Sequence, residues 1–275
     1  WSVCPPTRLQ FCTFISNLSF YNKGHLDTKS MPELEQLFLD SSFLEPAGAN
    51  FQVNLEFAVF RVSERSLEIF SLPAGLSPFE GDMALPFKRV EKEDLEATAK
   101  DYLIDELHLG PITHLEQVTS YSTSKPDSAV RQLNLLFLGV LGFPDETSLV
   151  HSKNMRGSFS LVSGIHDDDQ TLSHHDQHMI MLAHKRLSTS LQDTTLATQF
   201  CPKKFTLGQL RSIYESVWST KLDPANFRRK VLKSTNFVEY VSNMPPTHKH
   251  GRPAHLYQRG SLTHFYPGLP MPNQS

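Results

Sequence analysis

Runs of apolar residues in the first half of the chain have the length and spacing of β-strands. Two short runs, 53–60 (VNLEFAVF) and 67–72 (LEIFSL), are separated by the polar stretch RVSERS and predict a β-hairpin. Two longer runs, 112–122 and 130–143, lie on either side of the turn-rich stretch TSKPDS and predict two further strands.

The pattern changes to helical spacing between and after these strands. From Glu93 to Leu107 apolar side chains recur every three or four residues, and Gly110-Pro111 ends this predicted helix. A second helical pattern covers 177–191, and the polar segment 144–172 before it predicts a mobile loop. Strands interleaved with helices predict an α/β (α+β) sandwich.

The last quarter of the chain carries clear signals for the start of helices. Thr206 and Gln209 have the spacing of a capping box, and Asp223 followed by Pro224 predicts the N-cap and first residue of a second helix. The stretches FVEYVSN and AHLYQR then predict two strands. Two helices joined by a short turn and followed by a β-ribbon are the elements of a winged helix-turn-helix.

These patterns predict a multidomain organisation. The chain has 275 residues, 39% of them hydrophobic, which is enough apolar material for more than one core. The expected parts are an irregular N-terminal extension at 1–50 with one short helix, the sandwich at 51–195, the winged helix at 202–260, and a disordered Pro-rich tail at 261–275.

Positive charge is concentrated in the winged-helix segment. The whole chain has 26 Lys and Arg, 29 Asp and Glu, and a net charge of -3. Within 202–260, however, eleven Lys and Arg stand against three Asp and Glu, so 15 basic and 26 acidic residues remain elsewhere. A basic small domain beside an acidic larger one indicates a polyanionic partner for the small domain, although a solvated cationic face has the same composition.

Cysteine usage and hydropathy limit the location of the protein. The three cysteines form neither a CxxC pair nor an even framework, which is typical of a reducing compartment and argues against a thiolate zinc site. No apolar run approaches the roughly 20 residues of a membrane span, so no membrane partner is expected. The chain starts at Trp1 without a basic n-region, and a removed targeting segment stays open. We expect a cytoplasmic protein, associated with the nucleoid if the organism is bacterial.

The second helix of the winged segment, LDPANFRRKVLK, has two different faces. At about 100° per residue, Phe227 and Val231 lie on one side, and the polar residues lie on the other or on its flanks. Asn side chains pair with adenine and Arg side chains with guanine in the major groove, whereas flanking cations hold phosphates. A charged helix in a protein-docking module is the competing explanation. The predicted DNA-binding residues are Asn226, Arg228, Arg229, Lys230, Lys233 and, on the wing loop, Arg252.

The segment KKFTLGQLRSIYESVWSTKLDPANFRRKVLKSTNFVEY, followed by HGRPAHLYQR, resembles the winged-helix domain of the NrtR-type, Nudix-related transcriptional regulators. Upstream, LPFKRVEKEDLEATAKDYLIDELHLG resembles a Nudix box, and the resemblance covers roughly residues 50–260. It implies a Nudix-like sandwich followed by a DNA-binding winged helix, with NFRRK reading bases and GRPA forming the wing.

The Nudix-box resemblance is incomplete where the family holds Mg²⁺ through glutamates. Tyr102 replaces the first of these glutamates, Asp101 replaces an Arg and His108 replaces a Gly. Asp105 and Glu106 keep carboxylates, so they are the candidates for a weak Mg²⁺ site and for catalysis if the box is active. Because a phenol stays protonated at neutral pH, Tyr102 cannot replace a carboxylate, and hydrolysis is not expected. No cofactor is required by this reading, and Mg²⁺ is the one candidate.

The resemblance implies a nucleotide or sugar effector such as ADP-ribose or a compound related to NAD metabolism. Lys88, Arg89 and Arg131 are the candidate phosphate ligands, although each also fits a surface cation. The His- and Asp-rich stretch HDDDQTLSHHDQH fits either a Zn²⁺ or Ni²⁺ site or a polar loop.

The preferred hypothesis is a DNA-binding transcriptional regulator, with double-stranded DNA and a nucleotide or sugar effector as partners. A homodimer would place two such helices on a palindromic site. The alternative is a Mg²⁺-dependent Nudix hydrolase of nucleoside-diphosphate derivatives that uses Asp105 and Glu106. A third class is a protein-interaction module without either activity.

Overall fold

The computed structural model of the chain describes its central and C-terminal parts. Residues 50–275 form one compact unit. The predicted extension at 1–50 lies outside the described residues except for Asn50. No described helix has both the length and the apolar character that a membrane crossing requires. The described residues are 50–73, 82–91, 94–123, 130–143, 155–165, 172–243, 255–266 and 268–271.

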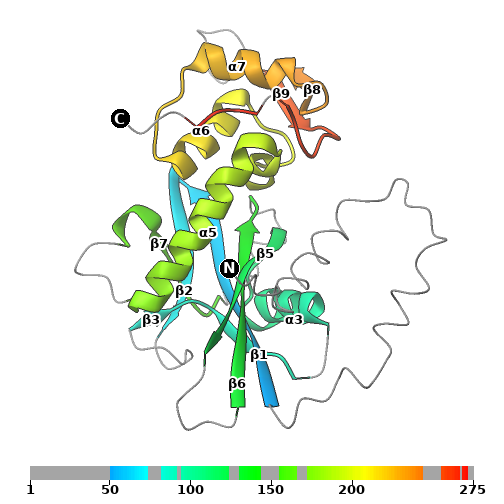
Figure 1. Ribbon diagram of the computed structural model, residues 1–275. Helices are drawn as coiled ribbons and strands as arrows, with labels where there is room; N and C mark the ends of the chain where they lie inside the picture. Colours follow the sequence, from blue (N-terminus) through cyan, green and yellow to red (C-terminus); the bar gives the residue numbers. More distant parts are fainter. Residues whose placement is uncertain are drawn as a thin grey trace, which may run out of the picture. The chain divides into compact units, whose positions relative to one another are not determined.

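A mixed sheet forms the centre of the fold (Figure 1). Among the described residues it has seven strands in the order β3-β2-β1-β6-β5, with β4 pairing with β1 and β7 with β2. β1 and β6 run parallel, and the other neighbours are antiparallel. The predicted hairpin and both further strands are confirmed. The strands are β1 (Asn50–Ser63), β2 (Ser66–Pro73), β3 (Met83–Ala84), β4 (Phe87–Arg89), β5 (Ile112–Thr123), β6 (Val130–Leu141) and β7 (Ser158–Leu161).

Part of the predicted mobile loop at 144–172 is regular structure. β7 pairs with β2 through Ile69 and Ser160, and a 3-10 turn at Val162–Gly164 follows it. The Arg61 guanidinium also lies 3.6 Å from the ring centroid of Phe159. The loop prediction is therefore wrong for these residues, because a strand of four residues is too short to show a period in the sequence.

Alternate residues of β1 pack on opposite faces of the sheet. Ala58 and Phe60 belong to a core cluster with helix α5 (His174–Asp193), whereas Leu55, Phe57 and Val59 belong to a cluster with helix α3 (Leu95–Asp101). This follows from the two-residue period of a strand. A sheet covered by a helix on each face confirms the predicted α/β sandwich (Figure 1).

The predicted helix at 93–107 begins as expected and ends in a widened turn. The Asp94 carboxylate caps α3 by accepting from the backbone N–H groups of Glu96 and Ala97. The turn Tyr102–Glu106 that follows is a π-helix, in which the N–H of Leu107 donates to the carbonyl of Tyr102 at 3.0 Å.

The C-terminal elements form the predicted winged helix. Helix α6 (Leu207–Trp218) starts with a capping box of Thr206 and Gln209, and α7 (Pro224–Lys233) starts with Asp223 as N-cap. Strands β8 (Val238–Asn243) and β9 (His255–Arg259) pair as an antiparallel ribbon. A single core cluster runs from the α5 face of the sheet into α6 and α7.

The predicted disordered tail at 261–275 is wrong for its described residues. The N–H of Phe265 donates to Asp193 at 2.8 Å, and the N–H of Leu269 donates to Gln192 at 2.6 Å. Both side chains are buried in the core cluster that contains α5. Burial of these two apolar side chains fixes the segment in place although it forms neither a helix nor a strand among its described residues.

Candidate functional site

Helix α7 turns Phe227 and Val231 inward. Phe227 and Val231 are buried, and the Phe227 ring meets the Tyr214 ring of α6 edge-on at 5.4 Å between centroids. The inward side predicted from the helical period is therefore the one that packs on α6. This fixes the rotation of α7 about its axis, because its opposite side must then face away from the core.

The predicted base-reading and phosphate-binding residues of α7 are all exposed. Asn226 and Arg229 already contact each other, since Nη2 of Arg229 donates to Oδ1 of Asn226 at 2.9 Å. Within the described chain, no Asp or Glu forms an ion pair with any cation of α7. The exposed positions are Asn226, Arg228, Arg229, Lys230 and Lys233.

The wing is described at its strands but not at its tip. Tyr240 and Tyr257 are cross-strand partners, and the Gln258 amide donates to the Glu239 carboxylate at 2.9 Å. Arg252, the predicted wing contact, lies outside the described residues.

The Nudix-like box places Tyr102 next to a cation. Tyr102 is buried, and this burial raises the pKa of its phenol to about 12, so the side chain is neutral at pH 7. The Lys88 ammonium lies 5.2 Å from the centroid of the Tyr102 ring and 2.5 Å from Oε1 of Glu106. A lysine and a carboxylate therefore face each other where the family pattern has carboxylates and a metal.

The carboxylates that remain in the box do not fit a magnesium centre. Among the described residues, no three His, Cys, Asp or Glu side chains are close enough to hold a metal ion. Asp101, Asp105 and Glu106 are exposed, and Glu106 is already paired with Lys88. Mg²⁺ prefers several oxygen ligands in octahedral geometry, which this arrangement does not supply while Lys88 holds Glu106.

The three predicted phosphate ligands do not form one cluster. Lys88 pairs with Leu55 of β1 and Arg89 with Asn54, so their side chains point to opposite faces of the sheet. Arg131 pairs with Phe51, on the same face as Lys88 but four residues, or about 13 Å, further along β1. Lys88 alone of the three reaches the Nudix-like box.

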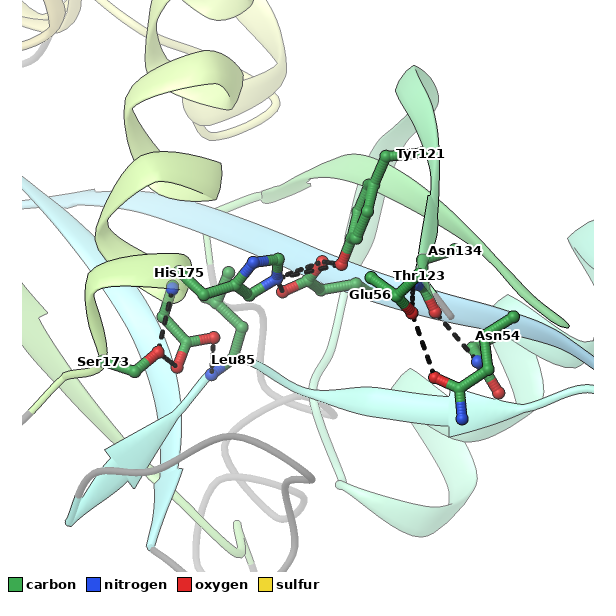
Figure 2. Close-up of polar contacts among 10 residues, drawn as sticks. Asn54, Glu56, Leu85, Tyr121, Thr123, Asn134, Ser173 and His175 are labelled. Carbon is green, nitrogen blue, oxygen red and sulfur yellow. Dashed lines mark hydrogen bonds and ion pairs between the residues drawn. The ribbon is translucent and has the colours of Figure 1, made fainter. Parts of the chain in front are cut away.

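A buried polar network on the other face was not predicted from the sequence (Figure 2). The Glu56 carboxylate of β1 is 1% exposed and accepts a hydrogen bond from the Tyr121 hydroxyl of β5 at 2.7 Å. Nε2 of His175, in the first turn of α5, lies 3.1 Å from Oε1 of Glu56. Next to His175, the Asp176 carboxylate accepts from the Ser173 hydroxyl at 2.7 Å. The network therefore joins β1, β5 and the start of α5.

The same face carries a row of buried amides. Nδ2 of Asn54 donates to Oδ1 of Asn134 at 2.8 Å, and Nδ2 of Asn134 donates to the Thr123 hydroxyl at 3.2 Å (Figure 2). Asn54 and Asn134 are directly paired on the parallel strands β1 and β6. Buried amides need partners, and these two satisfy each other.

Charge within the network shifts the pKa values of its members. Burial alone lowers the pKa of His175, but the hydrogen bond and negative charge of Glu56 more than reverse this and raise it. Burial and the charge of Glu56 raise the pKa of Tyr121. Burial, with a smaller contribution from Glu56, also raises the pKa of Asp176. The negative charge of Glu56 thus favours the protonated forms of His175, Tyr121 and Asp176.

One sequence signal for this network was available. Glu56 is the single charged residue in the apolar run VNLEFAVF, and a charge in a buried strand needs a partner. His175 and Asp176 belong to the His- and Asp-rich stretch, whose residues 166–171 lie outside the described residues. The described part of that stretch caps α5 and binds Glu56.

A cavity of about 350 Å³ lies where the β1–β2 turn, α5 and α6 meet. Its lining includes Arg65, His184 and Glu215 but no residue of the Nudix-like box. The chemistry of the box and this cavity are therefore separate features of the chain.

Comparisons with known proteins agree with both parts of the fold. The family model of the NrtR DNA-binding winged helix domain matches residues 197–258. The ADPR responsive transcriptional repressor NtrR of Acinetobacter baylyi is 27% identical over 210 residues, which cover 75% of this chain and 81% of that protein.

Solved structures extend the likeness to the sandwich. The crystal structure of Shewanella oneidensis NrtR complexed with a 27mer DNA has a TM-score of 0.64 at 17% identity, covering 79% of this chain and 99% of that one. A MutT/nudix family protein from Enterococcus faecalis has a TM-score of 0.58 at 13% identity, covering 93% and 99%. The chain therefore carries an NrtR-type winged helix at residues 197–258, and its fold is similar to that of Shewanella oneidensis NrtR.

Proposed function

We propose that this chain is a DNA-binding transcriptional regulator whose Nudix-like domain binds an ADP-ribose-like effector without hydrolysing it. The observation that carries the proposal is the orientation of α7. Its buried Phe227 and Val231 leave Asn226 and Arg229 on the exposed side, and no described acidic residue neutralises them. Such a side fits a major groove.

The Nudix-like box supports binding without hydrolysis. A neutral Tyr102 and an ion-paired Glu106 stand where metal-holding carboxylates are needed. An effector that is not consumed shifts the population of states for as long as it is present. The curated relative from Acinetobacter baylyi is named ADPR responsive, which makes ADP-ribose the first effector to test.

Helix α5 supports coupling between the two parts. Its first turn contacts Glu56 of the sheet through His175, and its later turns contact α6. There, Nε2 of His184 bonds the Val217 carbonyl at 2.8 Å and Nε1 of Trp218 donates to the Ser188 carbonyl at 3.0 Å. Helix α5 therefore contacts both the sandwich and the winged helix. A homodimer would present two such domains to a palindromic operator.

Selection of bound DNA from a random pool, with and without ADP-ribose, tests the proposal and supplies the operator. Arg229→Ala should then lose roughly 1–3 kcal/mol of binding free energy on the operator and relax the preference at one base pair. Arg228→Ala is the matched control, since a phosphate contact should weaken binding to all sequences alike. If Arg229→Ala distinguished the operator from other DNA sequences as well as the wild type does, Arg229 would not be a base-reading residue.

Two outcomes would favour the other functional classes. Release of AMP from ADP-ribose and Mg²⁺, abolished by Glu106→Gln, would identify a Nudix hydrolase. Failure to shift any DNA at low salt, where phosphate contacts are strongest, would leave a protein-interaction module.

A further inference from the structure

We propose that the ammonium of Lys88 takes the place of the divalent cation of a Nudix box, so that a diphosphate binds here without metal. The diphosphate part rests on the function proposed above. The replacement of the metal rests on the geometry of Lys88 alone.

Strand pairing fixes the position of Lys88. β4 is antiparallel to β1, and Lys88 is the direct partner of Leu55, whose side chain packs in the core cluster with α3. Lys88 therefore points toward the face that carries the Nudix-like box. It reaches Glu106 at the end of the π-turn, and its ammonium also faces the Tyr102 ring.

The ion pair leaves little for a metal to bind. Glu106 is the carboxylate closest to the family pattern, and one of its oxygens already accepts from Lys88. A divalent cation would have to displace the Lys88 ammonium from Glu106. The displaced ammonium would stay nearby and repel the cation, because both are positively charged. The pair is half exposed, so we assign it little effect on fold stability. Its consequence is that Lys88 competes with a divalent cation for the Glu106 carboxylate.

The same arrangement suits an anion. An ammonium has three N–H donors, and Glu106 occupies one of them. Arg156 adds a second positive charge close enough to act on Tyr102, while the negative charge of Glu106 acts on the same ring. Lys88 contacts both Tyr102 and Glu106, and Arg156 adds positive charge to the same region. Phosphate oxygens are strong acceptors for such donors.

The metal alone gives the first test, without any nucleotide. Free Mn²⁺ is measured by electron paramagnetic resonance during titration of the full chain. We expect no site that depends on Glu106 in the wild type, a gain of Mn²⁺ binding in Lys88→Met, and its loss again in Lys88→Met/Glu106→Gln. Lys100→Met is the matched control, because Lys100 pairs with Glu96 on α3 and should leave Mn²⁺ binding unchanged.

Two results of this titration would overturn the inference. One is a wild-type Mn²⁺ site that disappears in Glu106→Gln. The other is a Lys88→Met protein that binds no more Mn²⁺ than the wild type, with Lys88→Gln giving the same result and both variants folded by circular dichroism.

Calorimetry with ADP-ribose and with inorganic pyrophosphate gives the second test. The affinity should be equal in EDTA and in Mg²⁺, and Lys88→Met should weaken it about tenfold, which corresponds to one charge-assisted hydrogen bond. Binding that requires Mg²⁺ would refute the inference and leave the effector intact. Absence of ADP-ribose binding under both conditions would refute the proposed effector, while the Mn²⁺ titration still decides the role of Lys88.

Discussion

Replacing Glu56 by Gln removes the carboxylate charge that joins β1 to His175 in the buried network at the start of α5. The carboxylate is 1% exposed, accepts from the Tyr121 hydroxyl at 2.7 Å, and lies 3.1 Å from Nε2 of His175. Gln has nearly the same shape, and its amide oxygen still accepts from Tyr121. The substitution therefore isolates the charge interaction with His175 from packing and from the Tyr121 hydrogen bond.

The expected loss is set by burial. Removing one partner of a buried ion pair costs roughly 3–5 kcal/mol. Because His175 is 24% exposed in its side chain and Gln keeps one acceptor, we expect about 2 kcal/mol for Glu56→Gln. That loss is a large part of the roughly 5–15 kcal/mol that holds a typical domain folded.

The loss should depend on pH in a definite direction. The pKa of His175 is raised in the folded protein, so its pairing stabilises the fold fully below the unfolded pKa of about 6.5 and is lost as pH rises through the folded pKa. Glu56→Gln should therefore cost more near about pH 6 than near about pH 9. Asp176, whose pKa is also raised, chiefly by burial, faces Glu56 from the same helix turn and is present in both proteins.

Urea unfolding at the two pH values measures the effect as a change in midpoint at constant slope. Glu68→Gln is the matched control, because it breaks a more exposed pair with Arg61 and should cost at most about 1 kcal/mol at either pH. Equal losses for Glu56→Gln at both pH values would show that the charge on His175 does not stabilise the fold, and would refute this reasoning.

Two further predictions concern the packing around α5. Trp218→Phe removes the indole N–H that bonds the Ser188 carbonyl at 3.0 Å, so it should lower the free energy of unfolding by about 2 kcal/mol in urea titrations; no change would mean that this contact does not stabilise the junction. Leu269→Ala leaves a cavity at a position that is 6% exposed and should lower the free energy of unfolding by about 2–4 kcal/mol in the same titrations. The control Tyr266→Ala removes a side chain that is 99% exposed and should leave this free energy unchanged. Equal results for the two variants would mean that the tail is disordered, as the sequence predicts.

The elements that the sequence predicts best are those whose signals are local. Capping by Thr206 and Asp223 needs only a side chain and the next backbone N–H groups, and both caps are as expected. The same holds for the inward side of α7, because the helical period places Phe227 and Val231 together whatever the rest of the chain does.

Features that depend on distant partners were missed or misplaced. β7 exists because β2 pairs with it, and Leu269 is ordered because α5 offers a backbone carbonyl and an apolar surface. The pairing of Lys88 with Glu106 joins residues 18 apart through the register of β4 against β1, which no periodicity encodes. For the same reason the sequence grouped Lys88 with Arg89, although the strand sends them to opposite faces.

The two ends of α5 are held by different kinds of interaction, and this difference bears on how an effector would act. Its C-terminal half shares an apolar core with α6, where Leu187 and Leu191 are fully buried and Trp218 is fixed to its backbone. Its first turn is held to the sheet by the polar contacts of His175 and Asp176. Apolar burial is non-directional and changes little when a helix shifts slightly, whereas hydrogen bonds of about 3 Å are lost by the same shift.

Under the proposed function, a conformational difference between the two states is therefore expected at the sheet end of α5, with α6 moving together with the helix. An effector alters DNA binding only if its affinity differs between those states. The Glu56–His175 contact lies at that end, on the strand whose other face carries the partner of Lys88. Strand β1 thus contacts both the Nudix-like box side and the base of α5, and a ligand that shifts β1 acts on both.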